Sequence, residues 1–152
     1  MNKHTLIPFS ILMFAGALLT GCATMQSIEV SNRSRMFEAD YTTTLKAAVD
    51  YLNTEGWQIS TVDKDLGIIN TEFKSTSGLE AIFTGQERYK INFSVQKQFA
   101  TQTKVIANML YERKTGGNLF NPGEWTQANM TEGTAIKKYK EILDGVQLKI
   151  VK

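Results

Sequence analysis

The sequence predicts an α+β domain, in which an antiparallel meander sheet packs against two helices, after an N-terminal signal peptide. Two segments, around residues 41–54 and 136–150, repeat apolar residues at helical spacing. Several segments between them alternate apolar and polar residues, which is typical of strands with one face in water. An apolar run after a basic start, residues 6–19, has the composition of a signal peptide.

The apolar run is followed by the only cysteine of the chain. The run is shorter than the ~20 residues that a membrane-spanning helix needs. Leu19-Thr20-Gly21-Cys22 resembles the bacterial lipobox, in which a signal peptidase recognises the three residues before the cysteine and cuts there. The resemblance implies a diacylglycerol on the thiol of Cys22 and a further acyl chain on its new amino group. Several chains matter because one chain alone binds membranes only marginally.

The residue after the cysteine, Ala23, implies by the same resemblance export to the outer membrane, with the domain in the periplasm or at the cell surface. The alternative is an ordinary signal peptide, or an uncleaved anchor, with a cysteine there by chance. Cleavage before Cys22 removes residues 1–21 and leaves 152 − 21 = 131 residues, which is one domain by length.

Composition excludes several functional classes. The mature chain has 16 Lys and Arg (17 minus Lys3) against 15 Asp and Glu, and no basic patch interleaved with aromatics, so we expect no nucleic-acid partner. The only histidine, His4, lies in the signal peptide. The mature domain therefore lacks the imidazole and free thiol of common nucleophilic sites and of most zinc and copper sites. We expect no enzyme, no metal and no cofactor beyond the acyl chains on Cys22.

The first part of the mature chain has three expected elements. Residues 22–34 are polar and read as a flexible tether, which leaves 35–152 as the domain. Residues 35–39 form a short strand candidate. Asp40 can cap a helix over Tyr41 to about Thr54, whose inner face carries apolar residues at offsets 0, 4, 7, 8 and 11, and Gly56 follows the helix end.

The remaining elements are strands and a final helix. Residues 57–62, with Trp57, Ile59 and Thr61 on one side, and residues 68–73 form a hairpin around an Asp-rich turn. Residues 87–96 and 103–112 form a second hairpin. Their apolar residues point to one side and are Tyr89, Ile91, Phe93, Val95, Val105, Ala107, Met109 and Tyr111. The last helix carries its apolar face on Ile136, Tyr139, Leu143, Val146 and Ile150.

One stretch resembles a known family. Residues 37–73, "FEADYTTTLKAAVDYLNTEGWQISTVDKDLGIINTEF", are similar to the repeat unit of the BamC lipoproteins of the outer-membrane barrel-assembly machinery, and to small lipoproteins with that domain. The shared pattern is an aromatic strand, a helix with small inner residues, an aromatic after glycine, and an Asp-containing turn that ends in glycine. The resemblance implies a helix-grip fold and an envelope binding or scaffold role without catalysis. BamC proteins carry two such domains, whereas this chain has room for one.

Two groups of carboxylates could form chemical sites. Asp63 and Asp65 could begin a calcium loop, but the series of ligands stops at Leu66-Gly67, and turn chemistry explains both residues. A pair among Glu72, Glu80, Glu87 and Glu124 could serve glycoside hydrolysis. Nothing in the sequence pairs them, and solvated surface carboxylates are the simpler interpretation.

Two connecting segments, residues 75–85 and 115–125, are longer than a tight hairpin needs. In a meander they leave the same end of the sheet. Apolar residues gathered there are typical of a partner-binding surface; they are Leu79, Ile82, Phe83, Leu119, Phe120 and Trp125. The alternative is that they cap the core, or that residues 80–83 extend a strand.

The sequence therefore predicts an outer-membrane lipoprotein, held to the membrane by its lipid anchor, whose non-catalytic domain binds another envelope protein or serves as a scaffold. The alternative function is a carrier of an apolar ligand between sheet and helix, or an inhibitor of an envelope enzyme.

Overall fold

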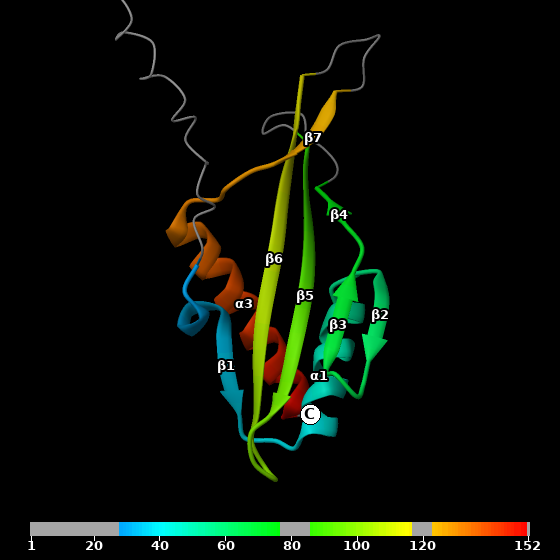
Figure 1. Ribbon diagram of the computed structural model, residues 1–152, viewed down its shortest axis with the longest axis vertical. Coiled ribbons are helices and arrows are strands. Elements are labelled where there is room, and N and C mark those ends of the chain that lie inside the picture. Colours follow the sequence, from blue (N-terminus) through cyan, green and yellow to red (C-terminus); the bar gives the residue numbers. More distant parts are fainter. Residues whose placement is uncertain (1–27, 77–85, 117–122, 152) are drawn as a thin grey trace, which may run out of the picture.

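The computed structural model describes residues 28–76, 86–116 and 123–151. In these ranges a seven-stranded antiparallel sheet packs by one face against the helices α1 and α3, which lie behind the sheet in Figure 1. The strand order is β1-β6-β5-β3-β2, with β4 added to β5 and β7 added to β6. The predicted α+β class and meander sheet are confirmed. The expected signal peptide and the lipobox, Leu19 to Cys22, lie outside the described residues.

The described chain begins with a segment that contacts the domain. Ile28 packs against the core, and η1 (Val30–Arg33) is a short 3-10 helix. The strand β1 (Ser34–Phe37) then pairs with β6 and buries Phe37 completely. Residues 28–34, which the sequence assigned to the tether, therefore contribute to the fold.

The helix α1 (Tyr41–Thr54) has the predicted bounds. A carboxylate oxygen of Asp40 accepts a hydrogen bond from the backbone N–H of Thr43 at 3.0 Å, which satisfies one of the free donors of the first turn. The inner face of α1 packs on the sheet and on α3, and its buried residues are Thr44, Leu45, Ala47, Ala48, Tyr51 and Leu52.

The first hairpin consists of β2 (Ile59–Asp63) and β3 (Ile68–Thr71). A bulge lies between Ile59 and Thr61, so that Ile59 pairs with Thr71 while Thr61 pairs with Asn70. A bulge adds one residue to the strand and shifts its alternation. The prediction that Thr61 shares a side with Ile59 is therefore wrong, and Thr61 is exposed.

The short strand β4 (Lys74–Ser75) leads into β5 (Glu87–Lys97), which forms a long hairpin with β6 (Thr103–Thr115). The predicted alternation is confirmed, because the inward residues of this hairpin form the centre of the core: Ile91, Phe93, Val95, Val105 and Ala107 are each at most 2% exposed. The strand β7 (Glu124–Gln127) pairs with the end of β6. Neither β4 nor β7 was expected from the sequence.

The last helix, α3 (Glu132–Ile150), covers the same sheet face. Its buried residues are Ala135, Tyr139, Ile142, Leu143 and Val146. The predicted face is thus rotated slightly, because Ala135 and Ile142 are buried while Ile136 is only partly buried. No helix in the described ranges has the length and apolar character needed to cross a membrane.

The long hairpin extends beyond the helices at one end (Figure 1). This end, where β5 begins and β6 finishes, is called the distal end below. Along the outer edge of β6, β1 covers one part and β7 covers another. The part of the edge between them faces the start of α3 (Figure 1).

Candidate functional site

The strand ends that flank both expected binding segments meet at the distal end. The backbone N–H of Thr76 donates to the carbonyl of Glu87 at 2.9 Å, and that of Lys114 donates to the carbonyl of Gln86 at 2.8 Å. Of the expected contact residues, five lie outside the described residues and stay predictions: Leu79, Ile82, Phe83, Leu119 and Phe120.

Trp125, the sixth expected contact residue, lies on β7 and not in a loop. It pairs with Lys114 of β6, so both side chains belong to the sheet face that points away from the helices. The indole is partly buried, and the guanidinium of Arg88 lies 4.4 Å from the centre of its ring. The position in a strand fixes the direction of the side chain, which a loop position would not.

Arg88 is the centre of a group that we call the Arg88 cluster, which consists of Phe73, Arg88, Glu112 and Trp125. The guanidinium stacks between two aromatic rings, at 4.3 Å from the centre of Phe73 and 4.4 Å from that of Trp125. It also donates to one carboxylate oxygen of Glu112, at 2.6 Å from Nε and 2.5 Å from a terminal nitrogen. Arg88 and Glu112 are direct cross-strand partners, which places them within reach of each other.

The Arg88 cluster lies at the surface of the sheet, with its two charged side chains partly buried. The Arg88 side chain is 27% exposed and that of Glu112 is 16% exposed. Two lysines flank the rings, with Lys90 at 5.9 Å from Phe73 and Lys114 at 5.8 Å from Trp125. The surface therefore combines aromatic faces with an excess of positive charge.

The opposite sheet face at the distal end carries a second polar group around Glu87. The carboxylate accepts hydrogen bonds from the hydroxyl groups of Tyr111 at 2.6 Å and Tyr89 at 2.8 Å, and from Arg113 at 2.9 Å. The two tyrosine rings stack with their centres 5.1 Å apart. Burial by itself would raise the pKa of Glu87, but the three donors outweigh it and hold that pKa below its ordinary value.

These contacts bear on the alternative of a carboxylate-based hydrolase. A general acid in such an enzyme needs a raised pKa, whereas the pKa of Glu87 is lowered. Glu72 and Glu124 are exposed, and Glu80 lies outside the described residues. The arrangement around Glu87 orders the end of the sheet and does not suit proton donation.

The Asp63 turn does not have the form of a calcium loop. One carboxylate oxygen of Asp63 accepts from the backbone N–H groups of Asp65 at 3.0 Å and of Leu66 at 2.9 Å. This is the turn chemistry expected from the sequence. In the ranges 28–76, 86–116 and 123–151, no group of three or more His, Cys, Asp or Glu residues could hold a metal.

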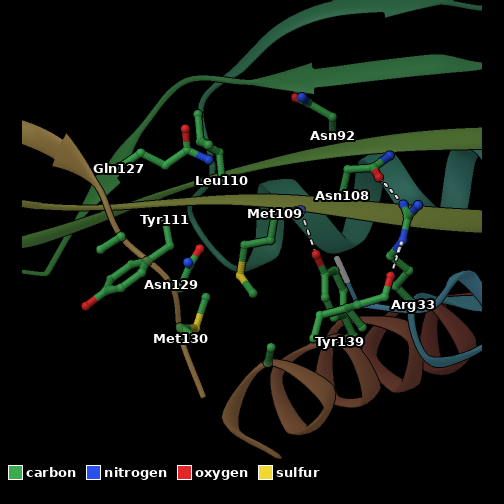
Figure 2. Close-up of a pocket in the computed structure, with 13 residues that line it drawn as sticks. Arg33, Asn92, Asn108, Met109, Leu110, Tyr111, Gln127, Asn129, Met130 and Tyr139 are labelled. Carbon is green, nitrogen blue, oxygen red and sulfur yellow. Dashed lines mark hydrogen bonds between the residues drawn. The ribbon is translucent and has the colours of Figure 1, made fainter. Parts of the chain in front are cut away.

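A cavity of about 400 Å³ opens at the edge of β6, between β1 and β7. We call it the edge pocket. Figure 2 shows Met109, Met130 and Tyr139 around the space between β6 and the start of α3. The Tyr139 hydroxyl accepts a hydrogen bond from the backbone N–H of Met109 at 3.1 Å. The lining also includes Ile28, Arg33, Asn92, Asn108, Leu110, Tyr111, Gln127, Ala128, Asn129 and Ala135.

Sequence reasoning missed most of these residues for identifiable reasons. Arg88 and Glu112 lie on the water-facing side of two alternating strands. In the sequence, an ion-paired residue at such a position cannot be distinguished from an unpaired charged residue in solvent. Arg33 falls in the stretch that composition assigned to the tether. The clearest available signal was Trp125, a large aromatic residue shortly after a Gly-Pro-containing segment.

No family model matches the chain. No curated protein matches its sequence. The solved structures that are similar to it include two crystal structures of low identity. A DUF4468 family protein from Bacteroides ovatus has a TM-score of 0.42 and 10% identity, covering 80% of this chain and 88% of that one. A TBP-like protein from Parabacteroides distasonis has a TM-score of 0.41 and 10% identity, covering 75% and 90%.

Proposed function

We propose that this protein is a bacterial outer-membrane lipoprotein, anchored through Cys22, whose domain binds another envelope protein and catalyses no reaction. The lipobox, Leu19 to Cys22, supports the anchor. The observation that carries the binding role is the Arg88 cluster, an arginine stacked between Phe73 and Trp125 on the sheet face away from the helices.

The composition of the Arg88 cluster suits a protein partner. Tryptophan, tyrosine and arginine dominate the energetic centres of protein interfaces. Stacking and the Glu112 ion pair already restrict the Arg88 side chain, so binding would cost less side-chain entropy. The flanking Lys90 and Lys114 favour an acidic partner surface through charge complementarity.

The position of the cluster supports a scaffold role. Its four residues come from β5, β6, β7 and the chain just before β4, so one partner would contact several strands at once. The core lies on the opposite side of the sheet, against α1 and α3. A partner can therefore bind this face without disturbing the packing that stabilises the domain.

The binding role is tested by photo-crosslinking in cells. A photoreactive phenylalanine replaces Lys90, beside the cluster, and in a matched strain replaces Gln96, an exposed residue on the same face of β5 at the other end. We expect a discrete protein adduct at position 90 and none at 96. Adding Arg88→Ala or Trp125→Ala should greatly reduce the adduct at 90. An adduct of equal strength at both positions, or one that ignores both substitutions, would contradict the proposed surface.

The anchor is tested separately. Cys22→Ala should abolish incorporation of labelled palmitate and release the protein from the outer-membrane fraction, since no other cysteine is present to take the diacylglycerol. Glu72→Gln, a change at an exposed position far from the lipobox in the sequence, serves as a control that keeps Cys22. Palmitate labelling that persists in Cys22→Ala would refute the anchor.

A second candidate function, carrier of an apolar ligand, is favoured by the edge pocket. Its volume of about 400 Å³ lies within the range of small-ligand sites. Its lining mixes apolar side chains with a few polar groups, as such sites do.

A further inference from the structure

The edge pocket contains a cation that has donors to spare. Arg33 donates from Nε to the carbonyl of Ile28 at 3.2 Å, and from a terminal nitrogen to Oδ1 of Asn108. A guanidinium has five N–H donors, so these bonds use two of them. Among the residues that the structure describes, no carboxylate forms an ion pair with Arg33. An anionic group entering the pocket would find an uncompensated positive charge.

A second polar group in the lining also lacks a partner. Oδ1 of Asn92 is buried, and no hydrogen-bond donor of the described chain reaches it. Buried acceptors without a donor are rare in native proteins, and each one needs an explanation. Asn92 is the cross-strand partner of Asn108, which itself contacts Arg33. By the alternation of β5 and β6, the side chains of Asn92 and Asn108 lie on the sheet face away from the helices, whereas Met109 packs toward the core, so the edge pocket extends around the uncovered edge of β6.

The rest of the lining is apolar and adaptable. Met109 and Met130 lie on opposite walls, one from β6 and one from the chain between β7 and α3, with Tyr139 beneath (Figure 2). Methionine side chains are flexible and fit irregular apolar groups. The pocket thus has a charged part at Arg33 and an apolar part at the two methionines. This combination is complementary to an amphiphile, which has a charged head and an apolar chain.

The pocket also lies near the expected membrane. Ile28, which lines it, follows Cys22 by 28 − 22 = 6 residues. A fully extended chain spans at most about 3.3–3.6 Å per residue, so Ile28 lies within roughly 20 Å of the acylated cysteine. Membrane lipids are therefore the amphiphiles that the pocket would meet at the highest local concentration. This step alone rests on the proposed anchor.

We propose that the edge pocket binds one acyl chain of a phosphate-headed lipid, a role beyond the proposed partner binding. The phosphate contacts the free N–H groups of Arg33, and the acyl chain lies against Met109 and Met130. The Arg88 cluster, on another part of the sheet, remains available to a protein partner.

The test measures binding in solution, so that it does not depend on the anchor. The whole mature chain, residues 22–152, carries Cys22→Ser to remove its own acyl chains. Equilibrium dialysis below the micelle concentration compares lysophosphatidylglycerol with monoacylglycerol, which has the same chain and no phosphate, and with glycerol phosphate, which has no chain. We expect saturable binding of the lysophospholipid and at least tenfold weaker binding of the other two, because monoacylglycerol loses the charge-assisted contact and glycerol phosphate loses the burial of the acyl chain.

Two variants locate the site. Arg33→Gln should weaken lysophosphatidylglycerol binding roughly 10- to 100-fold. Met130→Gln, which keeps the length of a partly buried side chain, should weaken it roughly fivefold. Lys97→Gln, an exposed change at the far end of β5, should have no effect. Circular dichroism confirms that each variant is folded.

Three outcomes would overturn the proposal. The first is no saturable binding of the lysophospholipid. The second is monoacylglycerol or glycerol phosphate binding as tightly, which would make the site purely apolar or purely anionic. The third is tight binding that neither Arg33→Gln nor Met130→Gln weakens. None of these bears on Cys22 or on the Arg88 cluster, whose own tests are independent.

Discussion

The long hairpin of β5 and β6 has two halves that are stabilised differently. In the half beneath α1 and α3, the inward residues are aliphatic or phenyl and almost fully buried, as at Phe93 and Val105. In the distal half, the same sheet face carries Tyr89, Tyr111 and Glu87 joined by hydrogen bonds. The same alternating pattern thus supports a dry core in one half and a polar network in the other.

The difference shows how the sheet can extend beyond its helices. A bare aliphatic surface at the distal end would expose an apolar patch. Tyrosines provide a large apolar body with a polar tip, so they pack against each other while their hydroxyls reach a carboxylate or water. The distal half can then present the Arg88 cluster on its other face. We expect substitutions in the half beneath α1 and α3 to lower mainly the free energy of unfolding. Substitutions in the distal half should weaken mainly the binding of a partner.

The largest effect is expected from Phe93→Ala, because the side chain is 1% exposed and its loss leaves a cavity. The free energy of unfolding should fall by about 3–5 kcal/mol. Tyr89→Ala, on the same face of the same strand in the distal half, should cost only about 1–2 kcal/mol because Tyr89 is partly exposed. Urea unfolding measures both. Equal losses would mean that the two halves are packed alike.

A smaller effect is expected from Gly67→Ala, where β3 meets β5. Gly67 has φ +68°, and a Cβ there would lie 2.1 Å from the carbonyl oxygen of Val95. The substitution should cost about 1–3 kcal/mol from strain and displacement. Gly116→Ala is the matched control at the distal end, since Gly116 has φ +59° but nothing within 4 Å. The difference in thermal stability between the two variants isolates the steric part, and no difference would show that the strands move apart freely.

The smallest effect is expected from Glu87→Gln, at about 1 kcal/mol near neutral pH. Because hydrogen bonds lower the pKa of Glu87 in the folded state, its contribution is present above the ordinary value of 4.5 and is lost as the pH falls through the lower, folded value. Stability of the wild type should therefore decline more steeply below pH 4.5 than that of Glu87→Gln. Glu72→Gln, at an exposed position, is the control. Parallel pH profiles for wild type and Glu87→Gln would contradict the network.

Much of the fold was predictable because the signals are local. The helix α1 has a cap at Asp40 and a helical apolar face, and its observed bounds match those expected. The hairpin of β5 and β6 alternates over its whole length. The two strands that were missed, β4 and β7, are only two and four residues long, so neither contains enough alternation to be recognised.

The candidate site was less predictable because its residues come from separate strands. Trp125 was expected at a binding surface, but its neighbours Phe73 and Arg88 are 52 and 37 positions away in the chain (125 − 73 and 125 − 88). The pairing of β3 and β4 with β5 brings Phe73 to Arg88, and the pairing of β5 with β6 and of β6 with β7 brings Trp125 there. The same holds for Arg33, which reaches Asn108 across 75 positions.

The sequence by itself determined the α+β class, the helix α1, the alternating strands and the expectation of a lipid anchor, because periodicity, caps and the lipobox are encoded in neighbouring residues. Tertiary structure decided the arginine stacked between two aromatic rings, the carboxylate held by two tyrosines, and the pocket at the edge of β6. Each of these depends on strand register and on where an edge is left uncovered. Those are set by long-range pairing, which local patterns do not specify.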